Sequence, residues 1–234
     1  MKKHNVDCMV CGEELVYSSE DKEVKCIYCN DIYHSNVSCG EGHYICNTCH
    51  CKDSIDLIYS YCLKTDEKNP LKMAIELMKS KSVNMHGPEH HFLVPAILTT
   101  SYYNNIDKKE IKEEKLNLVR ERATKIPGGI CGSYGSCGAA VGTGLVISII
   151  TEATPLTEES WGLANEMTGY SLISMGKNGG PRCCKRNTFT AIMEASKFIE
   201  ERLGVKLYDY ADDKALCEFK KYNKQCIGKR CPFA

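Results

Sequence analysis

The sequence predicts a mainly α-helical protein, in which a helical bundle domain follows a small cysteine-rich module with little regular structure. Nine of the 16 cysteines fall within residues 8–62, a region with few large aliphatic side chains. Beyond that region, apolar residues recur at intervals of three and four, the period of an amphipathic helix. No convincing strand alternation follows. We therefore divide the chain into a module over residues 1–56, a helical domain over 57–210 and a cysteine-containing tail over 211–234.

Seven segments after the module have the pattern or the end signals of a helix. They are the stretches 54–64, 69–80, 88–105, 107–125, 137–150, 157–175 and 181–204. Asn69 is a natural N-cap before Pro70, and Gly204 is a stop signal. Pro95 is expected to kink the third helix or to start a new one. The stretch 137–150 is apolar on all sides, so it should be a buried central helix.

The charge and hydropathy of the chain disfavour several classes of protein. Lys plus Arg equals Asp plus Glu at 30 each, whereas a general nucleic-acid binder carries a basic excess. The longest apolar stretch has 14 residues, too few to span a bilayer, and the N-terminus lacks the apolar core of a signal peptide. CxxC pairs in such a chain are typical of metal or thiol chemistry in a reducing compartment. We therefore expect a cytoplasmic protein without a membrane contact.

The module carries four pairs of metal-ligand residues. In chain order they are Cys8 and Cys11, Cys26 and Cys29, His34 and Cys39, and Cys46 and Cys49. A CxxC turn presents two sulfurs to one tetrahedral zinc ion, so four pairs suit two ions. The order resembles the cross-brace zinc modules of the plant-homeodomain and RING kind. That resemblance implies that the first and third pairs share one ion, and the second and fourth pairs the other.

Other ligand sets are compatible with the same spacing. The two early CxxC turns can form a zinc ribbon, with a separate site later in the chain. His43, His50 and Cys51 can replace members of the second half. In each arrangement the filled ligand positions leave no open coordination site for chemistry, so we expect the zinc to fold the module rather than to catalyse.

Reactive side chains gather in three segments of the helical domain, "MHGPEHHF", "GGICGSYGSCGAA" and "GGPRCCKR". The candidate catalytic or ligand residues are Cys131, Cys137, Cys183, Cys184, His86, Glu89, His90, His91, Arg182, Lys185 and Arg186. Gly132, Gly135, Gly138 and Gly180 are the positions where backbone can approach a cofactor closely. Each segment also has an ordinary reading, as packed thiols, a hydrogen-bonded turn or close helix contact. Together they favour a shared site for a zinc ion, another metal or an iron–sulfur cluster.

The two adjacent cysteines raise a specific expectation. A helix N-terminus and three neighbouring cations lower the pKa of a thiol, so at least one of Cys183 and Cys184 should be a thiolate at neutral pH. Neighbours on a helix diverge by about 100°, so the two cannot both ligate one ion without strain. The tail cysteines Cys217, Cys226 and Cys231 are spaced too loosely to predict a zinc site, and we expect the tail to pack back or to relay thiols.

Several motifs resemble a known family. "HYICNTCH", "MHGPEHHFLVPAIL", "CGSYGSCGAAVGTG", "ATPL" and "GGPRCCKR" are similar to a cysteine-rich family of anaerobic bacteria and archaea, domain of unknown function 5714. The resemblance covers about residues 39–207, and members of that family also occur fused to methyltransferase domains. The "CGAAVGTG" stretch is similar to a CGAxxGA motif of helical proteins proposed to be redox-active. Neither resemblance implies an assigned reaction.

Two functions from different classes follow. The first is a metalloenzyme or redox protein that handles a small anionic, sulfur-containing or methyl-carrying substrate. Cys183 or Cys184 would act as nucleophile or ligand and His90 or His91 as base, with a methyltransferase or redox protein as partner. The alternative is a zinc-stabilised adaptor whose module docks a partner without catalysis.

Overall fold

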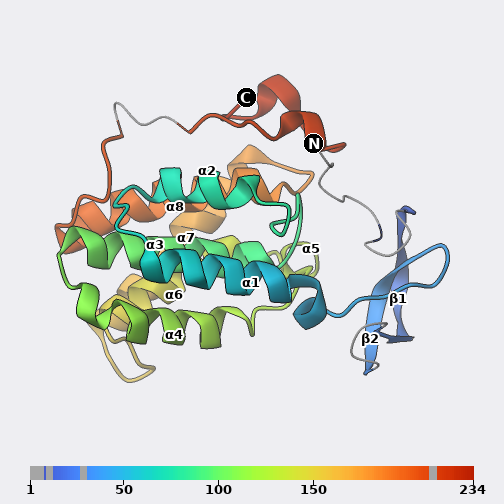
Figure 1. Ribbon diagram of the computed structural model, residues 1–234, viewed down its shortest axis with the longest axis horizontal. Coiled ribbons are helices and arrows are strands. Elements are labelled where there is room, and N and C mark those ends of the chain that lie inside the picture. Colours follow the sequence, from blue (N-terminus) through green and yellow to red (C-terminus); the bar gives the residue numbers. More distant parts are fainter. Residues whose placement is uncertain (1–7, 9–12, 27–30, 211–214) are drawn as a thin grey trace.

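A computed structural model of the chain confirms the predicted fold class. It describes residues 8, 13–26, 31–210 and 215–234, without the side chains of residues 48, 49, 51 and 52. These residues form eight α-helices and one two-stranded sheet (Figure 1). The helices are α1 (Asn47–Lys64), α2 (Pro70–Lys79), α3 (Glu89–Asn105), α4 (Lys112–Ala123), α5 (Ile130–Ser133), α6 (Gly138–Ile150), α7 (Glu159–Asn178) and α8 (Cys184–Leu203).

The module contains a β-hairpin that the sequence analysis did not predict. Strand β1 (Leu15–Lys25) pairs antiparallel with β2 (Ile32–Cys39), from Leu15 opposite Cys39 to Lys25 opposite Ile32. The hairpin stands beside the helical bundle, near the start of α1 (Figure 1). Because most of its side chains are exposed or half-buried, the hairpin has little core of its own. Such a small sheet needs stabilisation from outside its own core, and the metal-ligand residues of the module could provide it through a bound metal.

Helix α1 runs through the boundary predicted between residues 56 and 57. It starts in the cysteine-rich segment and ends inside the bundle, where Ile55, Ile58 and Cys62 are buried in the core. The module and the helical domain are therefore joined by a continuous helix rather than by a linker.

Helix α3 occupies the centre of the bundle. Fifteen of its 17 residues are buried, and it packs against α1, α2, α4, α6 and α8. Pro95 lies inside this helix, which continues through it to Asn105. The predicted buried helix at 137–150 is α6, with nine of 13 residues buried. Two helices rather than one therefore make up the interior.

The glycines of "CGAAVGTG" allow α6 to approach its neighbours closely. A Cβ at Gly138 would collide with the ring of His91, and one at Gly142 would lie 2.8 Å from Cδ of Pro95. Both contacts are with α3, whose residues 91 and 95 have the same four-residue spacing. Gly144 faces α7 instead, against Thr168 and the Ala164 carbonyl. The primary role of these glycines is helix packing.

The helix ends follow local signals with small differences. Asn69 Oδ1 accepts from Leu71 N at 2.9 Å, the predicted N-cap, and Gly204 ends α8 with a left-handed φ of 69°. Helix α7 begins at Glu159 rather than Thr157 and continues beyond the expected end at Met175 to Asn178. Helix α8 begins at Cys184, three residues after the predicted start at Pro181, with Cys183 as its N-cap.

The tail folds back over the bundle near α2 and α8 (Figure 1). It forms two 3-10 turns, η2 (Lys220–Tyr222) and η3 (Gly228–Arg230). Phe233 packs against Phe189 of α8 with ring centroids 5.3 Å apart. Tail packing was one of the two expected outcomes.

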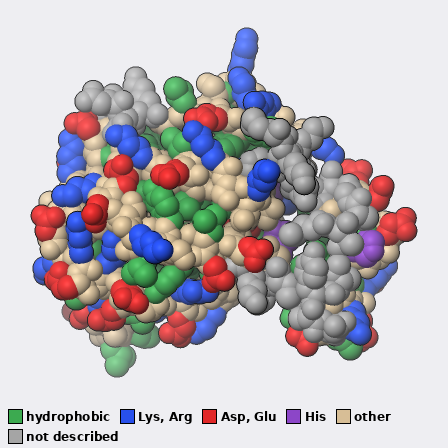
Figure 2. All heavy atoms as spheres, viewed as in Figure 1, with side chains coloured by type: hydrophobic (Ala, Val, Ile, Leu, Met, Phe, Trp, Pro, Cys, Tyr) green, Lys and Arg blue, Asp and Glu red, His purple; other side chains and the backbone are tan. Residues whose placement is uncertain are grey.

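The visible surface of the helical domain mixes both signs of charge (Figure 2), which agrees with a formal net charge of zero. Among the described residues, no helix combines the length and apolarity needed to cross a bilayer.

Candidate functional site

A Cys/His group lies at the end of the hairpin. Cys39 ends β2, and the chain then turns through Gly42, whose φ is 79°, so that His43 returns to it. His43 Nδ1 is 3.4 Å from Cys39 Sγ and 3.9 Å from Cys8 Sγ, and all three ligand atoms lie within 4.8 Å of one another. Ligand atoms about 2.0–2.3 Å from a tetrahedral metal are spaced in this way. The group can hold a metal ion, with one further position left for a fourth ligand.

His43 stands where the sequence analysis had placed His34. The side chain of His34 is exposed on β2, opposite Glu23, and is not part of the group. The reason is strand geometry, because residues 34 and 39 are an odd number apart and point to opposite faces. The turn at Gly42 was the missed signal. The predicted fourth ligand, Cys11, lies outside the described residues.

Two members of the second predicted set also lie together. Cys26 and Cys46 are both buried, and Cys46 N donates to Cys26 Sγ at 3.3 Å. Cys29 and the side chain of Cys49 fall outside the described part of the chain. Cys8 therefore lies with Cys39, and Cys26 lies with Cys46. Members of the two pairs alternate along the chain, as they do in a cross-brace module.

In the helical domain the adjacent cysteines lie in different surroundings. The predicted helical divergence is not the cause, because Cys183 is an extended N-cap outside α8. Cys183 faces the tail, where its sulfur accepts from Arg186 N and from Asn223 Nδ2, each at 3.5 Å. Cys184 faces the interior, where its sulfur accepts from the Gly87 N–H and interacts with the charges of Cys137, Glu89 and Arg182. The two thiols therefore belong to different environments.

The expected thiolate is wrong for the metal-free protein. Burial raises the pKa of Cys184 to about 12 and also raises the pKa of Cys183. Two of the three cations are committed to backbone carbonyls. Lys185 is fully buried and donates to Met78 O at 3.2 Å and Val83 O at 3.1 Å, and Arg186 donates to Gly179 O and Pro181 O. Arg182 is the only exposed cation of these three. The desolvation of the two thiols therefore outweighs the effect of the local positive charge on their pKa values.

The histidines of "MHGPEHHF" are largely structural. His90 Nε2 donates to Asn84 O at 3.1 Å, which leaves Nδ1 to accept from Thr188 Oγ1 at 2.9 Å. His91 Nδ1 contacts Ile126 O at 3.2 Å, under Gly138. With these partners His90 has no free nitrogen for a ligand or proton, contrary to the proposed base role. His86 contacts Asn223 Oδ1 at 3.3 Å, and burial lowers its pKa to about 4.

Acid should destabilise the fold through His90. Burial, assisted by the positive charges of Lys185, His91 and His86, holds its pKa well below the usual value, so it folds neutral. The contribution of neutral His90 to the free energy of unfolding is complete above about pH 6.5. It is lost as the pH falls, at about 1.4 kcal/mol per pH unit for one proton. Urea unfolding of wild type and His90→Gln at pH 7.5, 6.5 and 5.5 should give a flatter pH dependence in the variant. Equal slopes would contradict this, and the exposed His34→Gln serves as the control.

Glu89 is a buried acidic residue with one carboxylate oxygen that has no hydrogen-bond partner among the described residues. Its side chain is fully buried, and Oε1 accepts from Asn84 N at 2.7 Å. Oε2 has no hydrogen-bond partner among the described residues, and neither has His50 Nδ1, which lies 4.0 Å from it. Gly87 makes room for the carboxylate, because a Cβ there would overlap it. A buried carboxylate oxygen and a ring nitrogen without partners mark a position for a ligand.

Four elements converge at this position: α1 with His50, α3 with Glu89, the start of α6 with Cys137 and the start of α8 with Cys184. The Cys137 sulfur accepts from Asn187 Nδ2 at 3.3 Å. His50 was named only as a substitute ligand of the module. Since 39 residues separate it from Glu89, no local pattern signals their meeting.

The remaining predicted residues lie at the edge of this site. Cys131 is partly buried and interacts with the charge of Arg182, which also interacts with Cys184 and with the Tyr17 phenol of β1. Gly132, Gly135 and Gly180 face open space, so backbone approach remains available there, whereas Gly138 is covered by His91.

A cleft of about 650 Å³ lies between the module and the helical domain. Tyr33 and Tyr44 line it from the module, and Pro88, Phe92 and Arg120 from the bundle. Its volume is in the range of small-molecule sites, and Pro88 directly precedes Glu89. The adjacent cysteines do not line it, so cleft and thiols are separate features.

The fold and side chains define a mainly helical protein with a Cys/His metal-ligand group and a thiol-rich interior. The chain belongs to the Family of unknown function (DUF5714), whose profile matches residues 58–234. The match extends to the C-terminus, beyond the resemblance at 39–207, and it leaves out the module. No curated protein and no solved structure matches the chain.

Proposed function

We propose that this protein is a metal-dependent thiol protein whose helical domain carries out redox or sulfur- or methyl-group transfer chemistry. The reactive site consists of Glu89, His50, Cys184 and Cys137. The observation that supports it is the buried Glu89 Oε2, which lacks a partner and lies 4.0 Å from the equally unpartnered His50 Nδ1. A protein does not bury such a pair without cost, and a bound metal ion or polar substrate group would satisfy both atoms.

The donor set favours a metal of intermediate softness. A carboxylate, an imidazole and two thiols suit zinc or iron(II) better than magnesium or calcium. Metal binding would also solve the protonation problem of Cys184. Its thiol has a pKa of about 12 in the metal-free protein, and a bound cation converts a neighbouring thiol to the thiolate. The same metal would lower the energy of the buried carboxylate.

The substrate is a small anionic or sulfur-containing molecule. Arg182 is exposed and interacts with the charges of both Cys184 and Cys131, so it is the cation available to an incoming anion. Gly132 and Gly180 leave open backbone beside it. A methyltransferase or redox protein would supply or remove the transferred group, because the sequence has no nucleotide-binding motif of its own.

Two zinc ions hold the module in this proposal. Cys8, Cys39 and His43 bind one with Cys11, and Cys26 and Cys46 bind the other with Cys29 and Cys49. The module then positions α1, and with it His50, against Glu89. The protein acts in a reducing compartment such as the cytoplasm, where thiols persist.

Metal binding should protect Cys184 from alkylation. In metal-depleted protein at pH 9, Cys184 and the remote core thiol Cys62 should both react slowly, since burial raises each pKa to about 12. Adding zinc or ferrous iron should slow Cys184 at least about tenfold further while leaving Cys62 unchanged. Mass spectrometry at each cysteine measures both rates.

His50→Gln should abolish this protection, because it removes the imidazole ligand without disturbing α8. Protection that persists in His50→Gln, or no protection in the wild type, would rule out the metal site at Glu89. A variant of His34, which is exposed and outside the site, provides the control.

An adaptor function is the second candidate. Val16, Tyr17 and Ile32 are more than half exposed on the hairpin, a concentration of apolar surface on a small element. Such residues suit contact with a partner protein. If the protein is an adaptor, the Glu89→Gln and Cys184→Ser variants should bind the partner protein as well as the wild type does. The same variants should lose the thiol function, so this comparison distinguishes the two candidates.

A further inference from the structure

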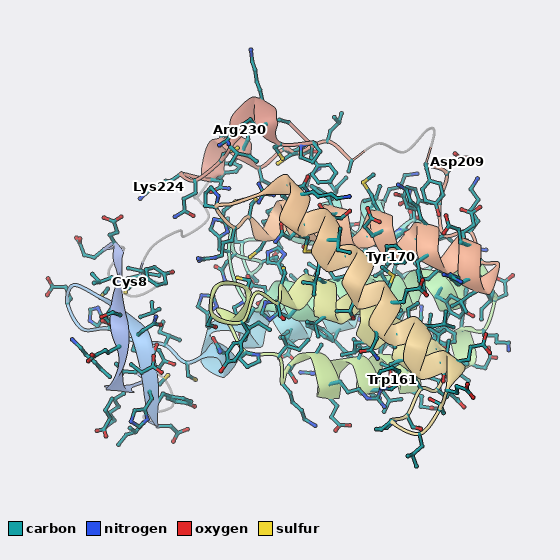
Figure 3. All side chains as sticks on the ribbon, turned by 180° about the vertical axis from the view of Figure 1, so that it is seen from behind. Cys8, Trp161, Tyr170, Asp209, Lys224 and Arg230 are labelled. Atoms are coloured by element: carbon teal, nitrogen blue, oxygen red, sulfur yellow. The ribbon has the colours of Figure 1, made fainter. Side chains whose placement is uncertain are left out.

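The tail brings three cysteines to Cys183. Cys217, Cys226 and Cys231 line a small cavity of about 20 Å³ together with Cys183 at the start of α8. In Figure 3 the labelled Lys224 and Arg230 mark this part of the tail, above the bundle on the side that carries the hairpin. The four thiols come from positions up to 48 residues apart, and all lie within the family match.

Specific contacts hold the tail in this place. Cys217 N donates to Phe233 O at 2.7 Å, which closes the tail into a loop. Asn223, itself buried, joins the loop to the helical domain through His86 and Cys183. Lys185 Nζ lies 5.1 Å from the ring centroid of Phe219. The cluster is therefore a built part of the fold rather than a chance approach of a loose end.

The sulfur atoms are surrounded by N–H donors. Cys183 Sγ accepts from Arg186 N and Asn223 Nδ2, and Cys226 Sγ accepts from Gly228 N at 3.4 Å. Gly228 reaches this position with a left-handed φ of 56°. Donors of this kind stabilise negative sulfur, and around iron–sulfur centres they set the reduction potential. Neutral packed thiols do not need them.

Charge and polarity around the cavity also suit a thiolate centre. Arg186 and Lys220 line it, as do the apolar side chains of Met85, Phe219, Ile227 and Phe233. Four thiolates in such surroundings need both a metal and nearby positive charge, because uncompensated anions in an apolar pocket are costly. Arg186 and Lys220 supply the positive charge, which leaves the metal to be bound.

We propose that Cys183, Cys217, Cys226 and Cys231 bind an iron–sulfur cluster. This centre is separate from the Glu89 site and does not depend on it. Four cysteines are the usual ligand set of such clusters, and Cys231 is followed by Pro232, as is the last cysteine of bacterial ferredoxin runs. A single zinc ion fits less well. Its sulfur ligands lie about 3.8 Å apart by tetrahedral geometry, whereas no three of these four sulfurs lie within 4.8 Å of one another.

The cluster occupies and widens the cavity at the interface of α8 and the tail. The tail there consists of η2, η3 and short connections, which allow a small outward shift. Because Cys183 is the N-cap of α8 and Cys184 is its first residue, the cluster and the Glu89 site lie on two sides of the same helix start. The cluster is thus placed to exchange electrons with the thiol site.

The test is cluster content in the full chain, purified without oxygen or reconstituted with ferrous iron and sulfide. We expect about four iron and four sulfide per chain and absorbance near about 400 nm. Cys226→Ser should lose most of this absorbance and sulfide. Cys226 is exposed, so this variant should keep the fold, which far-UV circular dichroism verifies. Cys217→Ser gives a second, independent loss.

Cys184→Ser is the matched control, because it changes the adjacent thiol whose sulfur points away from the tail. It should retain sulfide and the absorbance near about 400 nm. The Glu89 site is tested separately by alkylation of Cys184 in the wild type and in His50→Gln, so the two proposals fail separately. Sulfide content that is unchanged in Cys226→Ser and Cys217→Ser would overturn the cluster. A single zinc ion lost from both variants, or a Cys226–Cys231 disulfide in the anaerobic protein, would do so as well.

Discussion

Removing metal from the Cys8–Cys39–His43 group should unfold the hairpin while the helices of the family domain remain. The hairpin has little buried apolar surface, whereas α3 and α6 form a core that does not involve it. Structural zinc contributes about 10–16 kcal/mol of apparent binding free energy in small modules, far more than this sheet can supply. NMR of the full chain in excess chelator should show loss of the hairpin resonances alone.

Single variants sharpen the same test. Cys39→Ala should lose about one metal ion per chain, since Cys39 is buried within the group. His34→Ala should keep it, because His34 is exposed on the other face of β2. Equal metal loss in both variants would show that His34 is a ligand, as predicted from the sequence. Well-dispersed hairpin resonances in chelator would show that the module folds without metal.

Gly144→Ala should destabilise the helical domain by about 3 kcal/mol, the upper range for overpacking a core. The added methyl group would lie 2.5 Å from the Ala164 carbonyl of α7 and overlap Thr168, so the two helices must separate. Urea unfolding measures the change. Thr168→Ala in the same chain should restore only part of the loss, because the backbone carbonyl remains.

Gly162→Ala is the matched control on α7. Nothing lies within 4 Å of its added methyl group, so the gain in helix propensity should stabilise the protein by about 0.5–1 kcal/mol. If Gly144→Ala is as stable as wild type, α6 and α7 do not pack as closely as described. The opposite signs of the two substitutions cannot arise from propensity alone.

The sequence by itself determined the helices and the presence of metal-ligand pairs. Asn69 before Pro70 and Gly204 after the last turn act through neighbouring backbone groups, so their effects are readable locally. The apolar stretch at 137–150 could only be a buried helix. The divergence of Cys183 and Cys184 was predicted from the helical repeat, but Cys183 is an extended N-cap outside the helix, and the contacts of each sulfur assign the two thiols to different sites.

Ligand identity in the module required the tertiary structure. His34 and Cys39 have suitable spacing for a loop, but they lie on a strand, where an odd separation places them on opposite faces. Most side chains of β1 are exposed, so this strand lacks the apolar alternation by which strands are recognised. The sequence offered His43 only as a substitute in the second half of the module, and the turn at Gly42 places it with Cys39 and Cys8 instead.

Only the tertiary structure decided the chemistry of the interior. Cations beside Cys183 and Cys184 predicted a thiolate, but burial is a property of the whole fold and reverses the pKa shift. His90 became a structural residue because Thr188 arrives from α8 and the Asn84 carbonyl lies in the loop before α3. The Glu89–His50 pair and the four-cysteine cluster likewise join distant parts of the chain. Local sequence records which groups are present, whereas desolvation and long-range contacts determine their protonation and their partners.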